Sequence, residues 1–119
     1  MRDLLKLKYD ACSRILNSGL NVITIAPTSK VSAIVAYDYK KKNPDKQIEF
    51  IHIDYEDIST RASDIDELLS KAYKKATDYK FEQNAPQLIL QISTINMDTL
   101  ELPTPLLDAF GIAIQIDEF

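Results

Sequence analysis

The chain has 119 residues with a formal net charge of -4, and 45% of them are hydrophobic. That length predicts one domain over residues 1–119, and the acidic balance disfavours a nucleic-acid partner. No segment approaches the roughly 20 continuous apolar residues of a membrane span, and the charged start MRDLLKLKYD lacks the apolar centre of a signal peptide. We therefore expect a cytoplasmic protein without a membrane or nucleic-acid partner.

The first elements are predicted to be a helix and then a strand. Residues 3–18 place apolar side chains at helical spacing, and Gly19 follows as the residue that ends the helix. Cys12 is the only cysteine of the chain, which excludes an intramolecular disulfide and a cysteine-based metal site. The β-branched run VITIA at residues 22–26 lies between Asn21 and Pro27, so it predicts a short buried strand.

A second helix is predicted over residues 32–42, with Val31, Ile34, Val35 and Asp38 marking one face. It ends in three consecutive lysines, Lys40, Lys41 and Lys42. The helix dipole favours cations at this end, so we interpret the run as a solvated helix terminus. The alternative is a phosphate-binding patch, which needs a second supporting feature.

The second half continues the alternation of strands and helices. Residues 48–54 (IEFIHID) are predicted to form a strand covered on both faces, and Ser63 is predicted to cap a long amphipathic helix. Residues 88–92 (LILQI) predict another buried strand. A short helix with Thr104 as N-cap and Pro105 at its first position is predicted to end at Gly111, and a final strand follows at residues 112–116.

Strands that alternate with helices require crossover connections between parallel strands. The sequence therefore predicts an α/β fold of three layers, in which helices cover both faces of a mostly parallel, four-stranded sheet.

The stretch from Ser93 to Asp117, STINMDTLELPTPLLDAFGIAIQID, has a distinctive order. A polar STIN follows a buried strand, and LPTPLLDAF leads into another. This order resembles the sensor 1 to box VII region of AAA+ ATPases, particularly the MoxR and dynein-like branch, where ATxN is followed by LPxxLLDRF. The resemblance implies a minimal P-loop NTPase-like core with Asn96 at the sensor 1 position. It also implies that Ala109 stands where the family carries the arginine that reaches a neighbouring subunit's nucleotide.

The segment SGLNVITIAPTSKVSAIVAY resembles the same family around its phosphate-binding loop. A GxxxxGK[ST] loop needs glycines for its backbone, a lysine for the phosphates and a hydroxyl for magnesium. With Ala26 aligned to the first glycine, Val31, Ser32 and Ala33 occupy the positions of Gly, Lys and Ser/Thr. We therefore expect no tight Mg-ATP binding and no cofactor.

A residual anion site is still an option at the start of the second helix, where free N-H groups attract phosphate. Weak binding of phosphate, a nucleotide or Mg would then involve Thr28, Ser29, Lys30 and Ser32. The alternative is a simple helix N-cap.

The end of the second predicted strand, FIHIDYED, is similar to the Walker B pattern of a hydrophobic strand followed by Asp-Glu. Here Tyr55 separates Asp54 from Glu56. His52 and Asp54 are two residues apart, so on a strand both face one side and could bind a divalent metal. A structural role for His52 is the alternative.

These patterns lead to one principal hypothesis and one alternative. The principal hypothesis is a non-catalytic, AAA+-like protein-interaction or assembly module that binds a protein partner or forms a homo-oligomer, with Asn96 acting as a turn former. The alternative is a divergent nucleotide-binding phosphohydrolase or metal-dependent nuclease that uses Asp54, Glu56 and His52.

Overall fold

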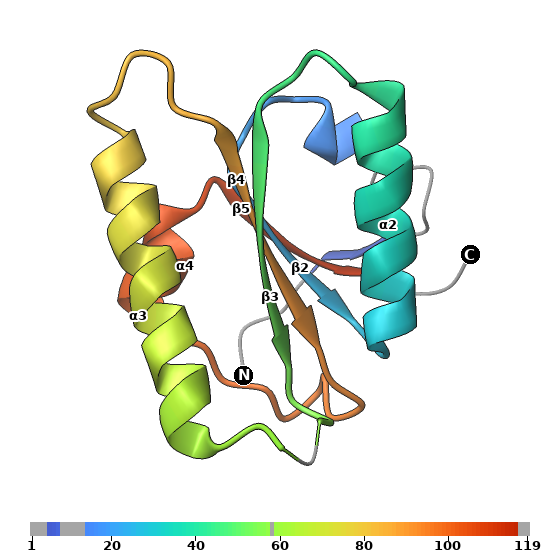
Figure 1. The fold of residues 1–119 in the computed structure, drawn as a ribbon. Helices are drawn as coiled ribbons and strands as arrows, with labels where there is room; N and C mark the ends of the chain where they lie inside the picture. The colour runs from blue at the N-terminus through green and yellow to red at the C-terminus, as the bar shows by residue number, and fades with distance from the viewer. Residues whose placement is uncertain (1–4, 8–13, 58, 117–119) are drawn as a thin grey trace.

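The computed structural model describes residues 5–7, 14–57 and 59–116. Strands and helices follow one another along this part of the chain (Figure 1). In chain order they are β1 (Leu5–Leu7), β2 (Val22–Ala26), α2 (Ser29–Lys42), β3 (Ile48–Asp54), α3 (Ala62–Tyr79), β4 (Gln87–Ser93), α4 (Thr104–Ala109) and β5 (Ile112–Ile116). Residues 14–16 are also helical.

The strands form one parallel sheet in the order β1-β5-β2-β4-β3. The predicted α/β fold and its four parallel strands are therefore confirmed. β1 adds a short edge strand, in which Leu5 pairs with Ile114 of β5. The helix predicted over residues 3–18 is wrong at residues 5–7, because pairing with β5 overrides their helical spacing. Residues 8–13, which include Cys12, lie outside the described part.

Helices cover both faces of the sheet, as predicted. α2 packs on one face and α3 on the other, with α4 beside α3 (Figure 1). The chain passes from β2 through α2 to β3, and it returns through α3 to β4 on the opposite face. Each change of direction along the sheet thus comes with a change of face, as right-handed crossovers require.

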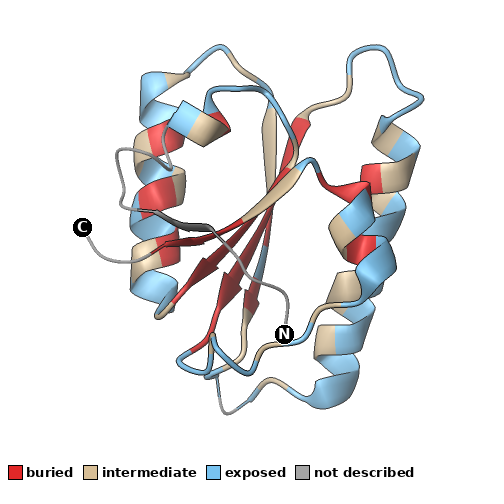
Figure 2. Ribbon diagram, turned by 180° about the vertical axis from the view of Figure 1, so that it is seen from behind, coloured by how far each residue is buried: buried red, intermediate tan, exposed pale blue. Residues whose placement is uncertain are grey.

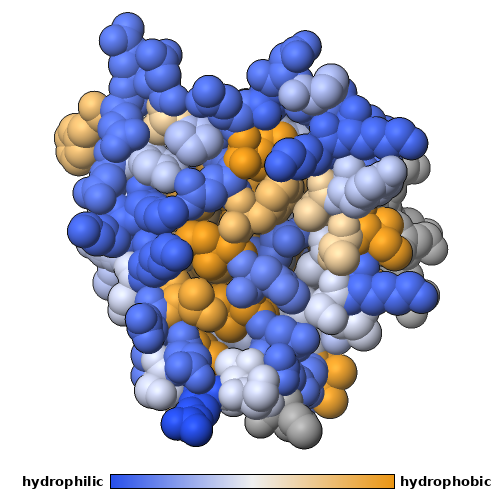
Figure 3. Space-filling model, in the orientation of Figure 1, coloured by the Kyte–Doolittle hydropathy of each residue, from blue (hydrophilic) through white to orange (hydrophobic). Residues whose placement is uncertain are grey.

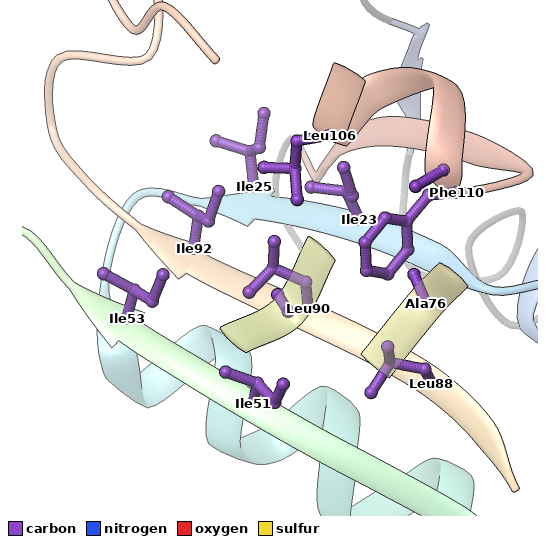
Figure 4. Packing of buried hydrophobic residues seen from close by; sticks show 12 residues of the cluster. Ile23, Ile25, Ile51, Ile53, Ala76, Leu88, Leu90, Ile92, Leu106 and Phe110 are labelled. Carbon is purple, nitrogen blue, oxygen red and sulfur yellow. The ribbon is translucent and has the colours of Figure 1, made fainter. Parts of the chain in front are cut away.

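The larger core cluster lies between the sheet and the α3/α4 layer. Alternate side chains of β2, β3 and β4, such as Ile23, Ile51 and Leu90, meet Leu106 and Phe110 here (Figure 4). Leu90 is fully buried, and burying such a side chain contributes about 1.5–3 kcal/mol. Seen from behind, the strands form the buried centre of the molecule (Figure 2).

A second cluster fills the α2 face of the sheet. Its buried members are Leu16, Val22, Ala26, Val35, Tyr39, Ile89, Ile114 and Ile116. α2 turns Ser32, Val35 and Tyr39 toward the sheet. The predicted apolar face is therefore rotated, because Ile34 remains 42% exposed.

The helix boundaries differ from the predictions by a few residues. α2 begins at Ser29, three residues before the predicted start, because Thr28 accepts a hydrogen bond from the Val31 N-H and acts as the N-cap. α3 begins at Ala62, so Ser63 lies inside the helix. The carboxylate of Asp64 instead accepts a hydrogen bond from the backbone N-H of Arg61, the residue before the helix. This bond replaces the predicted serine cap.

The two glycines of the chain have different structural roles. Gly19 has a φ of 83°, as expected of a residue that ends a helix. Gly111 does not adopt a positive φ. It is instead packed tightly, since a Cβ atom there would lie 3.1 Å from the Cβ of Leu20. α4 ends at Ala109, two residues before Gly111, so the helix ends close to the predicted glycine but without a left-handed turn there.

Tyr39 organises a buried hydrogen-bond network near the amino end of β4. Its hydroxyl lies 2.8 Å from the carbonyl oxygen of Leu16 and 2.6 Å from Oε1 of Gln87, and it accepts a bond from Nζ of Lys46 at 2.7 Å. Gln87 Nε2 donates to the same Leu16 carbonyl at 2.9 Å. The network therefore ties α2 to β4 and to the segment before β2.

β3 lies at one edge of the sheet, and its side chains interact with α3. Glu49 accepts hydrogen bonds from Lys75 and from the Tyr79 hydroxyl. The bond from Lys75 is the main cause that lowers the pKa of Glu49, while the bond to Glu49 raises the pKa of Tyr79 to about 12. Apolar side chains gather on the surface between α3 and α2, where β3 runs (Figure 3).

Candidate functional site

The carboxyl ends of β2, β3 and β4 lie at one edge of the sheet because these strands are parallel. β2 and β4 are neighbours, but the chain leaves them for opposite faces, toward α2 and α4 respectively. Open α/β sheets place ligands at such a switch point. In this protein the hydrogen bonds between β2 and β4 continue to the ends of the two strands, since the Thr94 N-H donates to the Ala26 carbonyl at 2.9 Å.

The connection from β2 to α2 consists of Pro27 and Thr28 alone. Thr28, Ser29 and Lys30 are exposed around the helix start. Ser32, the fourth predicted anion-binding residue, is 1% exposed and points into the core. The structure therefore divides this predicted set, with three residues facing solvent and one facing the sheet.

Ser32 belongs to a polar cluster between α2 and the sheet. Its Oγ shares a hydrogen bond of 2.9 Å with Oγ of Ser93, and Nε2 of His52 lies 2.9 Å from the same Ser93 oxygen. Gln91 donates through Nε2 to the Ser32 carbonyl at 2.8 Å. The cluster links β3, β4 and α2 by side chains that come from distant parts of the sequence.

A histidine beside a serine hydroxyl is the pairing that nucleophilic catalysis uses. Ser93, however, is 0% exposed, and its oxygen is already shared with Ser32 and His52. The hydroxyl is thus not accessible to a substrate in this structure. His52 itself is exposed on the edge strand β3, and the structural role that was one of its two predicted alternatives stays a prediction.

Ser93 and Gln91 were missed as members of this cluster. Their signal is present in β4 (QLILQIS), where Gln91 and Ser93 occupy alternate positions and Gln87 lies on the same face beyond Ile89. Alternate positions of a strand share a face. A polar column on the α2 side of a buried strand could have been inferred from that spacing.

Asp54 and Glu56 are both bound to backbone N-H groups. Asp54 Oδ1 accepts from the Glu56 N-H at 2.9 Å, and Glu56 Oε1 accepts from the Ile95 N-H at 3.0 Å and from the Thr94 hydroxyl at 3.2 Å. The bonds of Glu56 join the ends of β3 and β4, whereas that of Asp54 stays within its own turn. Within the described part of the chain, no three His, Cys, Asp or Glu side chains lie close enough together to hold a metal ion.

Asn96 lies in the turn after β4, as predicted. Its N-H donates to the Thr94 hydroxyl at 3.1 Å, and its carbonyl accepts from the Thr99 N-H at 3.1 Å. Asn96 and Glu56 line a hollow of about 310 Å³, to which none of the predicted anion-binding residues contributes. Tyr55 also lines the hollow. The pKa of its hydroxyl is raised by burial and, to a smaller extent, by the charge of Asp66.

Two other predicted positions are occupied by side chains with local roles. Ala109 is 7% exposed and packs in the α3/α4 core. Lys40, Lys41 and Lys42 are exposed at the end of α2. Lys42 forms an ion pair of 3.0 Å with Asp38, in keeping with a solvated helix end.

Comparison with protein-family models, with curated proteins and with solved structures found no match to this chain. A search of the described helices for one long and apolar enough to cross a membrane also found none.

Proposed function

We propose that this domain is a non-catalytic, AAA+-like module for protein interaction or assembly. One observation carries the proposal, namely that the connection between β2 and α2 is only two residues long and that Ser32 behind it is bonded into the core. Pro27 and Thr28 make the connection, and Ser32 is hydrogen-bonded to Ser93. A loop that wraps a phosphate needs converging backbone N-H groups and residues with positive φ.

No residue of this connection has a positive φ. Among the described residues, the one with a positive φ is Gly19, which precedes β2. Thr28 itself accepts one of the free N-H bonds at the start of α2. The N-cap and the lack of a positive φ in this connection support the proposal that it does not wrap a phosphate.

The acidic residues at the strand ends support the same proposal. Catalysis of phosphoryl transfer needs carboxylates that are free to hold magnesium and to orient water. Glu56 is instead bound to the turn after β4, and Asp54 to the backbone of its own turn. Both carboxylates thus accept hydrogen bonds from nearby groups of the protein, which supports a non-catalytic role.

Titration calorimetry with Mg-ATP and Mg-ADP tests the proposal, together with an ATP hydrolysis assay. We expect no heat of binding in the micromolar range and no turnover above background. Lys30→Ala and Asn96→Ala are the matched variants, since these side chains are exposed and their removal leaves the core intact. Micromolar binding by the unmodified protein that either variant abolishes would refute the proposal.

The enzymatic alternative makes a different prediction. A metal-dependent phosphohydrolase or nuclease would bind Mg²⁺ or Mn²⁺ through Asp54 and would lose that binding in Asp54→Ala. We expect the two proteins to give the same null response in a metal titration. Saturable binding by the unmodified protein alone would favour the enzyme.

A further inference from the structure

A groove of about 500 Å³ lies between α3 and α4, the two helices that cover one face of the sheet (Figures 1 and 2). Much of its lining is apolar and comes from Leu69, Tyr73, Pro103, Pro105 and Leu106. Tyr73 is 38% exposed. An aromatic side chain beside an open apolar groove is typical of a surface that binds another protein.

One acidic and one basic residue of α3 line this groove, at different points along the helix. Asp66 lines it near the start of the helix, and Lys74 lines it two turns later. Among the described residues, neither side chain forms an ion pair, whereas Lys75 is paired with Glu49. Lys74 stands more than one turn before Tyr79, the last residue of α3, so the helix dipole does not account for its charge.

These charges are self-complementary. Asp66 and Lys74 each lie four residues from Ser70 along α3, so a two-fold axis at Ser70 that sets two copies of α3 antiparallel exchanges their positions. Each Asp66 then faces the Lys74 of the other copy. A closed dimer needs such a patch, in which residue i contacts residue j and j contacts i.

We propose that the α3–α4 groove is the interface of a symmetric dimer of this chain, with the two α3 helices antiparallel about Ser70. This inference rests on the proposed function and gives the partner as a second copy. Burial of Leu69 and Tyr73 supplies affinity, while the two Asp66–Lys74 pairs fix the orientation of the helices. Ser70 has a small side chain and is exposed, so it permits close approach at the axis.

Sedimentation equilibrium of the full chain tests this interface through reversal of the charges. Asp66→Lys and Lys74→Asp each replace two attractive contacts with two repulsive ones, so we expect each to raise the dimer Kd about tenfold or more. The double variant D66K/K74D restores both pairs, and its Kd should lie close to that of the unmodified protein. Asp45→Lys is the control, since it makes the same charge change on an exposed residue outside the groove.

A second measurement uses cross-linking at the proposed axis. In a Cys12→Ala background, Ser70→Cys should form an intermolecular disulfide on mild oxidation, because the two sulfur atoms meet at the axis. Asp45→Cys in the same background should remain reduced. Far-UV circular dichroism of each variant confirms that it is folded.

The outcomes separate this inference from the proposed function. A monomer at high micromolar concentration overturns the dimer, as does a dimer whose Kd is unaffected by the single charge reversals or is not restored in D66K/K74D. Neither result bears on nucleotide binding. Mg-ATP binding would refute the proposed function whether or not the chain forms a dimer.

Discussion

Tyr39→Phe removes one oxygen atom from the protein and leaves an aromatic ring in the same buried position. The oxygen contacts Leu16, Gln87 and Lys46. In the variant the Leu16 carbonyl keeps the bond from Gln87 Nε2. Lys46 is only partly buried and can return to water. Gln87 Oε1 is left without a donor among the described residues, and Gln87 is only 6% exposed.

The expected cost follows from this one orphaned acceptor. A buried hydrogen bond contributes about 1 kcal/mol net, and leaving its acceptor unpaired costs about 1–3 kcal/mol, so we expect the free energy of unfolding to fall by about 2 kcal/mol. A domain of this size loses about 4 °C of Tm for each 1 kcal/mol, which corresponds to about 8 °C here. The urea m-value should not change, because the surface exposed on unfolding is the same.

Urea unfolding followed by circular dichroism measures this loss. Tyr37→Phe is the matched control, since Tyr37 lies on the same helix and is 69% exposed. We expect that control to change the free energy of unfolding by less than about 0.5 kcal/mol. If Tyr39→Phe costs no more than the control, the hydroxyl network does not stabilise the fold and the reasoning is refuted.

Three further substitutions test other parts of the structure. Glu49→Gln should lower stability by about 0.5–1 kcal/mol at neutral pH. Since the folded pKa of Glu49 lies below its ordinary value of 4.5, this difference is full above that pH and disappears as the pH falls through the folded pKa. Gly111→Ala should cost about 1 kcal/mol or more, because its Cβ would lie 3.1 Å from the Cβ of Leu20. Leu90→Ala should cost about 2–5 kcal/mol through the cavity that it leaves in the core. Chemical denaturation measures all three.

Each of these expectations has a control and a contrary result. Glu82→Gln removes an exposed carboxylate and should leave the pH dependence unchanged, so an equal change in both variants would contradict the role of the Glu49 pair. Leu20→Ala tests the same truncation at a side chain that is 50% exposed. A loss in Leu90→Ala as small as that of Leu20→Ala would contradict the assigned core. Gly111→Ala without any loss would show that the neighbouring chain moves freely.

The sequence predicted the fold through strong local signals. The run VITIA between Asn21 and Pro27 identified β2, and the long apolar stripe of α3 identified that helix. β1 could not be found this way. It is a strand of three residues that pairs with β5 near the other end of the chain. Its strand conformation comes from that pairing, and its own residue pattern favours a helix.

The candidate site was predictable where it depends on strand ends and unpredictable where it depends on contacts. Asn96 was correctly placed just after β4, because the end of a buried run is visible in the sequence. The bond between Ser32 and Ser93 joins residues 61 positions apart, and nothing local indicates it. For the same reason Ser32 was grouped with exposed neighbours, although the rotation of α2 turns it inward.

The strand order has a consequence for the path of folding. β3 and β4 are the only neighbours in the described sheet that are also consecutive strands of the chain. Their pairing closes the shortest loop, so we expect the β3-α3-β4 unit to form in the transition state. We expect β5 to pair with β2 after that unit has formed. Truncation of Leu90 in β4 should therefore slow folding, whereas truncation of Ile114 in β5 should mainly speed unfolding.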